Sequence, residues 1–398
     1  MASTFSFGFS GDDIDMDVDN DVEVEAGNNV SEKPNTEDTN APNSSFPAVR
    51  HALEDWTKNL PSQISYNTLK LGISSQDENN KKTITVARRE LFDVRTQLMA
   101  EDDAEDLATD NAELIAGLEQ GDLKPNFYEG GFKTWECSLD LADVLLTSVE
   151  IGASVEEGED VHVIELGCGT AVPSLMLFAK ILLSLTSTDR PGKKRYRFTM
   201  ADYNSTVLRM VTLSNFLLTW WVNSPSSPKA TTTPAEEPVD GNDEEEGELD
   251  IDTTLVDTFQ NDLANRGIEI DFISGGWSAE FVQLVLNPVG QEAANMSSTL
   301  ILASETIYSP SSLGVFSETV LDLLRHSVGS EEPTKNKSTA LIAAKKVYFG
   351  VGGGVDEFLQ VLDQQPLQDK ESVRVQERRE ITSGGVKRVV LEIGIERN

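Results

Sequence analysis

Short apolar runs alternate with longer amphipathic stretches through the C-terminal two thirds of the chain. The first such run, 161–166, ends in Gly-Cys-Gly, which predicts a buried strand and a tight turn. Strands that alternate with helices at this spacing form a mostly parallel sheet covered on both faces, so we predict a doubly wound α/β domain at 126–398. The remaining predicted strands are 197–201, 268–273, 298–303, 339–344 and 386–393, and the predicted helices are 174–185, 206–221, 279–286, 314–326 and 355–362.

The preceding part of the chain lacks this regular order. Residues 1–45 alternate acid with small or apolar side chains and then turn to Asn, Ser, Pro and Thr. They bury too little apolar surface to offset chain entropy, so we predict a disordered acidic tail. Residues 46–125 form an N-terminal extension, which contains an amphipathic piece at 51–60, a strand-like run at 83–86 and a charged helical stretch from about 104.

The chain is strongly acidic, and the acid is unevenly placed. Its 68 Asp and Glu against 32 Lys and Arg give a formal net charge of -36. A phosphate backbone repels such a chain, so we expect no direct binding of nucleic acid. A basic protein partner fits the charge, although the acid equally serves to keep unfolded segments soluble. The acid-rich segments are 11–25, 101–106, 154–160 and 236–252, the last of them within a stretch, 223–252, that predicts a surface insertion.

Nothing in the sequence predicts secretion or a membrane span. The two cysteines, Cys137 and Cys168, fit a reducing compartment better than a disulfide framework. The N-terminus lacks a basic start and an apolar run, so no signal peptide is expected. The most apolar stretch, 171–185, is interrupted by Lys180 and is too short to cross a bilayer. We therefore expect a soluble intracellular protein without membrane association, and we expect a monomer.

The turn after the first predicted strand has the composition of a cofactor-binding loop. It reads Glu165-Leu-Gly-Cys-Gly169, and its glycines let the backbone approach a ligand at the carboxyl end of the sheet. A phosphate-binding loop requires Gly-Lys-Ser/Thr, which is absent, and a dinucleotide fingerprint requires a third glycine where Val172 stands. The class that remains binds a nucleoside carrying an amino-acid tail, with the tail lying over Gly167 to Gly169.

Two further strand ends carry candidate ligand-binding residues. Asp202, followed by Tyr203 and Asn204, ends the second strand, where a carboxylate commonly holds a ribose diol; the alternative is a helix cap. The third strand runs into Ser-Gly-Gly276-Trp277. This sequence suits a slot for an adenine face, although a core tryptophan is the alternative.

Six motifs, taken together, resemble the histidine protein methyltransferases, and most closely the fungal type that modifies a histidine of a large-subunit ribosomal protein. The resemblance covers 125–398, and the combination is far more specific than any single motif. The parent group of seven-strand protein methyltransferases has an acid-x-x-Tyr motif after the fourth strand, here Glu305 to Tyr308. The six motifs are FYEGGFKTWECSLDL (127–141), VIELGCGTAVPS (163–174), ADYNSTVL (201–208), ISGGW (273–277), ASETIY (303–308) and AAKKVYFGVGGG (343–354).

This resemblance implies a Rossmann-like seven-strand sheet and S-adenosylmethionine as the cofactor. By the family pattern, Gly167 lies at the methionine part, Asp202 at the ribose and Ser304 near the methyl group. Ala171 stands where many members have a third glycine, which is a small departure. The candidate cofactor-binding residues are Thr134, Trp135, Glu136, Cys137, Ser138, Glu165, Gly167, Gly169, Asp202, Tyr203, Asn204, Gly276, Trp277 and Ser304.

The candidate catalytic residues are Glu305 and Tyr308. Methyl transfer to histidine needs no strong base, because neutral imidazole is already nucleophilic near pH 7. A carboxylate that accepts the other ring N–H fixes the tautomer, so we assign this role to Glu305 and the positioning of the ring to Tyr308. Alternatively, Glu305 caps the following helix and Tyr308 packs beneath the loop.

The predicted activity is transfer of a methyl group to the distal (tele) nitrogen of a histidine in a large-subunit ribosomal protein. The alternatives are a protein-lysine methyltransferase of the same fold and a non-enzymatic acidic escort for a basic partner. Lys345 and Lys346, beside glycines at 350–354, suit a substrate entrance or a loose turn. The three histidines show no metal-ligand spacing, so no metal site is expected. The usual setting of the family is the cytoplasm with nuclear access, and the basic run 193–197 fits either a nuclear signal or a loop before a strand.

Overall fold

The computed structural model describes most of the C-terminal domain and part of the N-terminal extension. The predicted tail at 1–45 lies outside the described residues, as does nearly all of the charged stretch predicted from about 104. Most of the acid-rich positions lie outside them too. The described residues are 46–72, 83–102, 114, 130–148, 160–184, 194–227, 245–287, 298–326, 337–350, 352–383 and 385–397.

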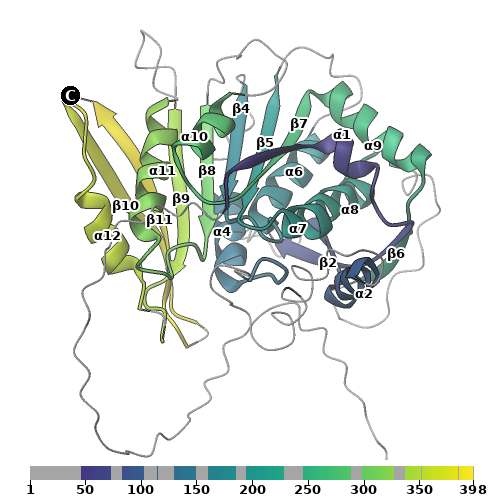
Figure 1. The fold of residues 1–398 in the computed structure, drawn as a ribbon, viewed down its shortest axis with the longest axis horizontal. Coiled ribbons are helices and arrows are strands. Elements are labelled where there is room, and N and C mark those ends of the chain that lie inside the picture. Colours follow the sequence, from purple (N-terminus) through teal and green to yellow (C-terminus); the bar gives the residue numbers. More distant parts are fainter. Residues whose placement is uncertain are drawn as a thin grey trace, which may run out of the picture.

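An eight-stranded sheet forms the centre of the protein (Figure 1). The five strands in its middle are parallel, whereas the strands at its edges pair antiparallel. From one edge to the other the strands are β1 (Val49–Ala52), β7 (Ile268–Ser274), β5 (Tyr196–Asp202), β4 (Val161–Leu166), β8 (Ser298–Ser304), β9 (Lys337–Lys345), β11 (Arg388–Arg397) and β10 (Glu371–Ile381).

This order confirms the predicted doubly wound, mostly parallel α/β fold and places its ligand crevice. The chain runs from β4 outward through β5 to β7 and then returns to β8, on the other side of β4. In an open sheet of this kind, ligands bind at the carboxyl ends of the strands where the winding reverses. The site is therefore expected at the ends of β4 and β8, between the two halves of the sheet.

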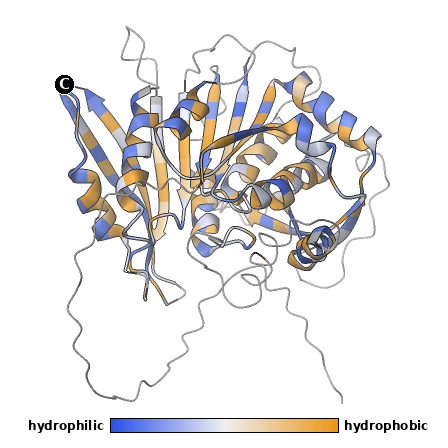
Figure 2. Ribbon diagram, in the orientation of Figure 1, coloured by the Kyte–Doolittle hydropathy of each residue, from blue (hydrophilic) through white to orange (hydrophobic). Residues whose placement is uncertain are grey.

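All the predicted strands of the domain are present, whereas β1 and β10 were not predicted. The strand β10 is rich in charged residues and only partly buried, as edge strands often are, so it lacks the apolar run from which the inner strands were predicted. The strand β1 pairs with β7 and adds an eighth strand to the seven that the family pattern implies. Figure 2 shows the contrast, because the inner strands are largely apolar and β10 is not.

Helices cover both faces of the large sheet, as predicted. The helix α9 was not predicted, although its ends carry clear signals: the Asp252 side chain accepts from Leu255 N at 2.8 Å, and Gly267 closes the helix with φ of 69°. One face packs against α4 (Glu136–Thr147), α6 (Val172–Ser184), α8 (Leu213–Asn223) and α9 (Thr253–Arg266). The other face packs against α10 (Ala279–Leu286), α11 (Leu313–His326) and α12 (Val355–Asp363).

A second, three-stranded sheet joins the N-terminal extension to the end of the predicted insertion. It consists of β3 (Thr83–Arg89), β2 (Gln63–Gly72) and β6 (Glu246–Asp250), all antiparallel. The strand β3 lies against α8, where Ala87 N donates to Thr219 Oγ1 at 3.1 Å. The remaining elements are α1 (Leu53–Thr57), α2 (Leu91–Asp102), α7 (Ser205–Val207) and the π-helix η1 (Leu208–Thr212).

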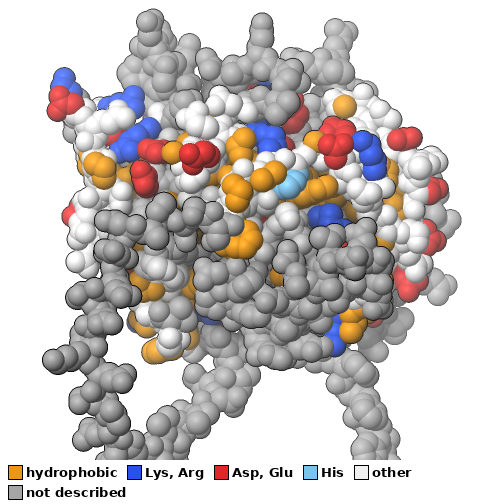
Figure 3. Space-filling model, viewed as in Figure 1, with side chains coloured by type: hydrophobic (Ala, Val, Ile, Leu, Met, Phe, Trp, Pro, Cys, Tyr) orange, Lys and Arg blue, Asp and Glu red, His pale blue; other side chains and the backbone are white. Residues whose placement is uncertain are grey.

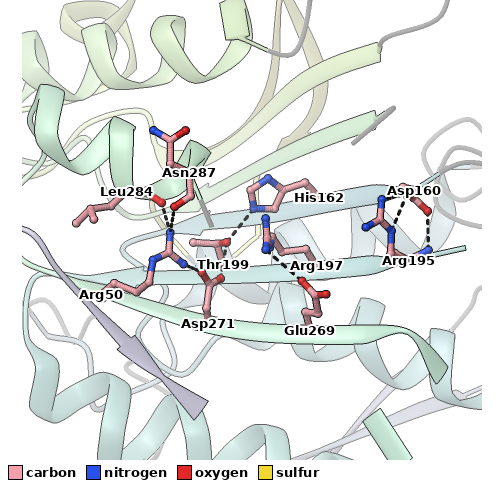
Figure 4. Close-up of polar contacts among 10 residues, drawn as sticks. All are labelled: Arg50, Asp160, His162, Arg195, Arg197, Thr199, Glu269, Asp271, Leu284 and Asn287. Atoms are coloured by element: carbon pink, nitrogen blue, oxygen red, sulfur yellow. Dashed lines mark hydrogen bonds and ion pairs between the residues drawn. The ribbon is translucent and has the colours of Figure 1, made fainter. Parts of the chain in front are cut away.

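A polar network fixes β1 to the large sheet on the side of α10 (Figure 4). Arg50 of β1 pairs with Asp271 of β7 and donates to the carbonyl of Leu284 at the end of α10. Thr199 donates to Asp271 at 2.6 Å, and the His162 ring lies 2.8 Å from the same hydroxyl. Burial lowers the pKa of His162 to about 3, so this ring is neutral in the fold. The network is structural, because its charges are paired with one another.

Two arginines of the basic run 193–197 also belong to this side of the sheet. Arg195 pairs with Asp160 at 2.6 Å, and Arg197 pairs with Glu269 at 3.1 Å. Basic and acidic side chains are likewise interspersed on the face of the protein drawn in Figure 3. Within the described part of the chain, no helix is long and apolar enough to cross a membrane.

Candidate active site

The glycine turn after β4 adopts a backbone conformation that requires its glycines. Gly167 and Gly169 have φ of 64° and 48°. A Cβ at Gly167 would lie 2.8 Å from Thr306 Cγ2, and one at Gly169 would lie 3.0 Å from the Gly131 carbonyl oxygen. Ala171 also has a positive φ, of 58°, which explains why a glycine suits this position in the resembling family. The turn is thus held between the end of β8 and the segment before α4.

Glu165 lies beneath this turn and is completely buried. Its Oε2 accepts hydrogen bonds from the backbone N–H of Ser174, at 3.1 Å, and from the Ser174 hydroxyl. Its Oε1 has no hydrogen-bond partner, and burial raises the pKa of the carboxyl to about 8. A completely buried carboxyl oxygen without a partner is uncommon in folded proteins, and beside a glycine turn it suits a cationic or donor group of a ligand.

Asp202, at the tip of β5, ties the neighbouring strand to the turn. Its Oδ2 accepts from Gly169 N at 3.0 Å, and its Oδ1 accepts from Asn204 N at 3.1 Å. The first bond orients the carboxylate toward the glycine turn, as the ribose interpretation requires. The second closes a turn before α7, because Asn204 is itself the N-cap residue of that helix. Asp202 is therefore not the helix cap that the alternative required.

The adenine candidates separate into two groups. The Tyr203 ring lies 4.9 Å from the ring of Phe46, and Gly276 N donates to the Phe46 carbonyl at 3.1 Å. The Trp277 ring instead packs 4.8 Å from Phe316 of α11, which fits the core alternative. Phe46 is a site neighbour that the sequence did not indicate, because it precedes the family motifs.

The segment before α4 lies across the glycine turn. The Thr134 hydroxyl donates to Thr170 Oγ1 at 3.0 Å, and Trp135 Nε1 donates to the Gly130 carbonyl at 2.9 Å. Glu136 points elsewhere, because it pairs with Arg388 of β11 at 3.2 Å. The remaining predicted residues of this segment, Cys137 and Ser138, form the first turn of α4 and are buried.

Glu305 is the most unusual residue at the carboxyl end of the sheet. It follows β8 directly and has φ of 56°, a conformation that costs a non-glycine residue about 1–2 kcal/mol. Both carboxyl oxygens are buried without a hydrogen-bond partner of standard geometry. Burial raises the pKa of Glu305, and the nearby Lys345 ammonium opposes this rise. The helix-cap alternative is wrong, because α11 begins only at Leu313.

Three side chains surround the Glu305 carboxyl, and none of them was predicted in this role. They are the thiol of Cys137, the ammonium of Lys345 and the hydroxyl of Tyr348. The Lys345 ammonium lies 5.5 Å from the Trp135 ring centre, and Tyr348 Oη accepts from Lys345 N at 3.2 Å. The signal was present in the sequence, since both residues lie in the sixth family motif.

The second catalytic candidate, Tyr308, is less directly placed. Its ring centre lies 6.3 Å from that of Tyr348 in an edge-on arrangement. Its backbone packs against the glycine loop, since a Cβ at Gly353 would lie 2.1 Å from the Tyr308 carbonyl oxygen. Lys346 is turned away to β10, where it pairs with Glu380 at 2.7 Å. Of the two candidate entrance lysines, only Lys345 belongs to the site.

These features fit a nucleoside with a cationic amino-acid tail. The turn has no side chains at Gly167 and Gly169, and the Oε1 atom of Glu165 lacks a partner. S-adenosylmethionine carries a sulfonium and an ammonium group that complement such a carboxyl. In the described part of the chain, no cluster of His, Cys, Asp and Glu suits a metal ion.

Comparison with known proteins identifies the family. No family model matches the chain. The chain is 36% identical over 310 residues to histidine protein methyltransferase 1 of Saccharomyces cerevisiae, covering 76% of this chain and 75% of that protein. The protein of the same name from Schizosaccharomyces pombe is 36% identical over 276 residues, covering 69% and 68%. A mouse protein named histidine protein methyltransferase 1 homolog is 29% identical over 272 residues, covering 68% of this chain and 58% of that protein.

Solved structures add little to this. An rRNA methylase from Streptococcus thermophilus matches 64% of this chain and 95% of its own at 12% identity, and its TM-score of 0.28 is too low to carry an argument. The yeast similarities extend over more than two thirds of both chains. S-adenosylmethionine is accordingly the methyl donor, and a histidine in a protein is the acceptor. The chain belongs to the histidine protein methyltransferase family.

Proposed function

We propose that this protein methylates a histidine of a large-subunit ribosomal protein at the distal (tele) ring nitrogen. The observation that carries the proposal is the buried Glu305 carboxyl at the end of β8, whose oxygens lack hydrogen-bond partners of standard geometry. The ribosomal acceptor is supported by the resemblance of the six sequence motifs to the fungal type. It also suits the charges, since ribosomal proteins are basic and this chain has a net charge of -36.

The position of the methyl group follows from the hydrogen bond that Glu305 is able to make. A neutral imidazole has one N–H and one bare nitrogen. If the carboxylate accepts the Nδ1–H, the ring is held in the tautomer whose bare nitrogen is Nε2, the distal one. The nucleophile is then selected by the carboxylate, without a base strong enough to ionise the ring.

The residues around Glu305 have separate tasks in this scheme. The Lys345 ammonium favours the ionised carboxylate, which is the form that accepts a hydrogen bond. The Tyr348 side chain neighbours the carboxyl, and we assign the positioning of the imidazole to the Tyr308 ring, which lies 6.3 Å from that of Tyr348. S-adenosylmethionine supplies the electrophilic methyl group when it is bound. After transfer, Glu305 receives the Nδ1 proton, which its raised pKa makes easier.

The proposal is tested with large ribosomal subunits from cells that lack the enzyme. The subunits are incubated with the purified protein and S-adenosylmethionine labelled in the methyl group, and the labelled protein is hydrolysed. We expect one large-subunit protein to carry the label, in tele-methylhistidine. Label in pros-methylhistidine would contradict the tautomer argument, and label confined to other proteins would contradict the ribosomal acceptor.

The site of action and the oligomeric state belong to the same proposal. We propose that the protein acts as a monomer in the cytoplasm and has access to the nucleus, where ribosomal subunits are assembled. Arg195 and Arg197 have partners inside the fold, which favours a loop before a strand over a nuclear signal. A fluorescent fusion and light scattering of the purified protein test these points. A dimer, or a protein confined to membranes, would contradict them.

A further inference from the structure

The small sheet of the N-terminal extension is connected to the cofactor turn by buried hydrogen bonds. Arg88 of β3 is 2% exposed, and its Nη1 donates to Thr134 Oγ1 at 3.1 Å. The Thr134 hydroxyl donates in turn to Thr170 Oγ1 at 3.0 Å. Asn67 of β2 orients the arginine, because its Oδ1 accepts from Arg88 Nη2 at 2.9 Å. Two strands that precede all six family motifs in the sequence are thus connected by hydrogen bonds to the turn that follows β4.

The backbone of the same turn residue is fixed by a second connection to β3. Asn215 Nδ2 donates to the Thr170 carbonyl at 3.0 Å, and Asn215 Oδ1 accepts from Arg89 N at 2.7 Å. Both the main chain and the side chain of Thr170 are therefore held by neighbours that β3 positions. Such two-point support orients a side chain more closely than a single contact does.

The direction of the hydroxyl relay is set by the arginine. A guanidinium only donates hydrogen bonds, whereas a hydroxyl both donates one and accepts two. Because Thr134 Oγ1 accepts from Arg88, its own hydrogen is directed to Thr170. Thr170 Oγ1 is consequently the acceptor in this pair, and its hydrogen remains available for another group. Thr170 is 6% exposed and lies in the turn over which the amino-acid tail of the cofactor is expected.

We propose that Thr170 donates this hydrogen to the carboxylate of the methionine moiety, and that Arg88 is the residue that positions it to do so. The relay Arg88–Thr134–Thr170 makes the small sheet a part of the cofactor site. A carboxylate is the only anionic acceptor in S-adenosylmethionine, and a hydrogen bond to a charged acceptor is among the stronger ones in proteins. The proposal depends on the cofactor alone and is independent of which amino acid receives the methyl group.

Calorimetric titration of the full chain with two ligands tests the contact. S-adenosylhomocysteine has the carboxylate, and 5′-methylthioadenosine lacks the whole amino-acid tail. The Thr170→Val variant keeps the shape of the side chain and removes the donor. We expect it to bind S-adenosylhomocysteine roughly ten- to a hundredfold more weakly, the loss expected for a hydrogen bond to a charged group. Its affinity for 5′-methylthioadenosine should stay within about twofold of the unmodified protein.

The arginine is tested in the same way. Arg88→Met removes the guanidinium that donates to Thr134, so the Thr170 hydroxyl can donate to Thr134 instead of to the ligand. We therefore expect weaker binding of S-adenosylhomocysteine and unchanged binding of 5′-methylthioadenosine. Arg88→Lys keeps a donor and should restore most of the affinity. Thr134→Ala interrupts the relay at its middle and serves if Arg88→Met fails to fold. The matched control is Lys70→Met on β2, which breaks a partly exposed pair with Glu245 at 3.6 Å and should leave both affinities unchanged.

Three results would overturn the proposal. The first is unchanged affinity of Thr170→Val for S-adenosylhomocysteine, which would show that the hydroxyl does not contact the tail. The second is an equal loss for both ligands, which would show that the turn has merely lost its shape. The third is a normal affinity in Thr134→Ala together with a tail-specific loss in Thr170→Val, which would remove Arg88 from the site. None of these readouts requires a methyl acceptor.

Discussion

Glu305 combines two unfavourable features, a left-handed backbone and a buried carboxyl without hydrogen bonds of standard geometry, and its replacement should separate stability from activity. Two variants are informative. Glu305→Gln keeps the shape of the side chain and removes its charge. Glu305→Gly removes the side chain and also relieves the φ of 56°. If the residue is retained for catalysis, the second variant should be the more stable protein and an inactive enzyme.

The expected magnitudes follow from the structure. Relief of the left-handed conformation stabilises the glycine variant by about 1–2 kcal/mol. The greater freedom of glycine in the unfolded chain offsets roughly 0.5–1 kcal/mol of this gain. Removal of a buried carboxyl whose oxygens lack hydrogen bonds of standard geometry adds about 1–3 kcal/mol. The free energy of unfolding of Glu305→Gly should thus rise by roughly 2 kcal/mol. Loss of a charge-assisted hydrogen bond to the imidazole should lower kcat in Glu305→Gln by about ten- to a hundredfold.

Urea denaturation followed by tryptophan fluorescence gives the stabilities, and label transfer at saturating S-adenosylmethionine gives the rates. The rate of the unmodified enzyme should also fall on the acid side, as the Glu305 carboxyl protonates at a pKa above that of an ordinary glutamate. This limb should be lost in Glu305→Gln. A glycine variant less stable than the unmodified protein, or a glutamine variant of normal activity, would refute the reasoning and make Glu305 a structural residue.

Three further predictions concern stability and binding. Burial raises the pKa of Glu165 from 4.5 to about 8, so the free energy of unfolding of the unliganded protein should fall by up to roughly 4 kcal/mol as pH rises through this window. Glu165→Gln should remove most of this pH dependence in denaturation curves recorded at pH 5 and pH 8. An unchanged difference between the two pH values would contradict the prediction. The lowered pKa of His162 has the opposite effect on stability: its contribution is present above pH 6.5 and is lost as pH falls toward 3. A His162→Gln variant should therefore lose less stability in acid. A variant as acid-sensitive as the unmodified protein would show that His162 does not cause this loss. Arg50→Met should lower the free energy of unfolding by about 3 kcal/mol, because it removes the ion-pair partner of Asp271. The control Lys58→Met breaks the exposed pair with Asp55 and should cost less than about 1 kcal/mol. Equal losses in thermal unfolding would show that the β1 network does not stabilise the fold.

The inner part of the fold was predictable because its strands are buried on both faces. Runs such as 161–166 and 298–303 are mostly apolar, and they were placed to within a residue or two. The strands β10 and β2 were not predicted because their residues face water on one side or alternate irregularly. Part of β3 was predicted, as the strand-like run 83–86. The strand β6 was hidden in an acidic stretch that resembles an unfolded insertion. Its pairing with β2 is a long-range contact that no local pattern encodes.

The site was predictable where a single segment carries it and unpredictable where distant segments meet. The glycine turn and Glu305 each follow a strand and Asp202 ends one, so their common position at the carboxyl edge followed from the topology. That Lys345 and Tyr348 border Glu305 depends on the pairing of β8 with β9. The connection from Arg88 to the glycine turn depends on how the small sheet packs against α8, which the sequence does not reveal.

The most direct test of the central claim is the identity of the methylated amino acid. Ribosomal proteins from cells that lack the enzyme are incubated with the protein and labelled S-adenosylmethionine, and the acid hydrolysate is separated by chromatography. The account predicts label in methylhistidine, and loss of that label with Glu305→Gln. Label in methyllysine, or label in methylhistidine that persists undiminished in the variant, would contradict it.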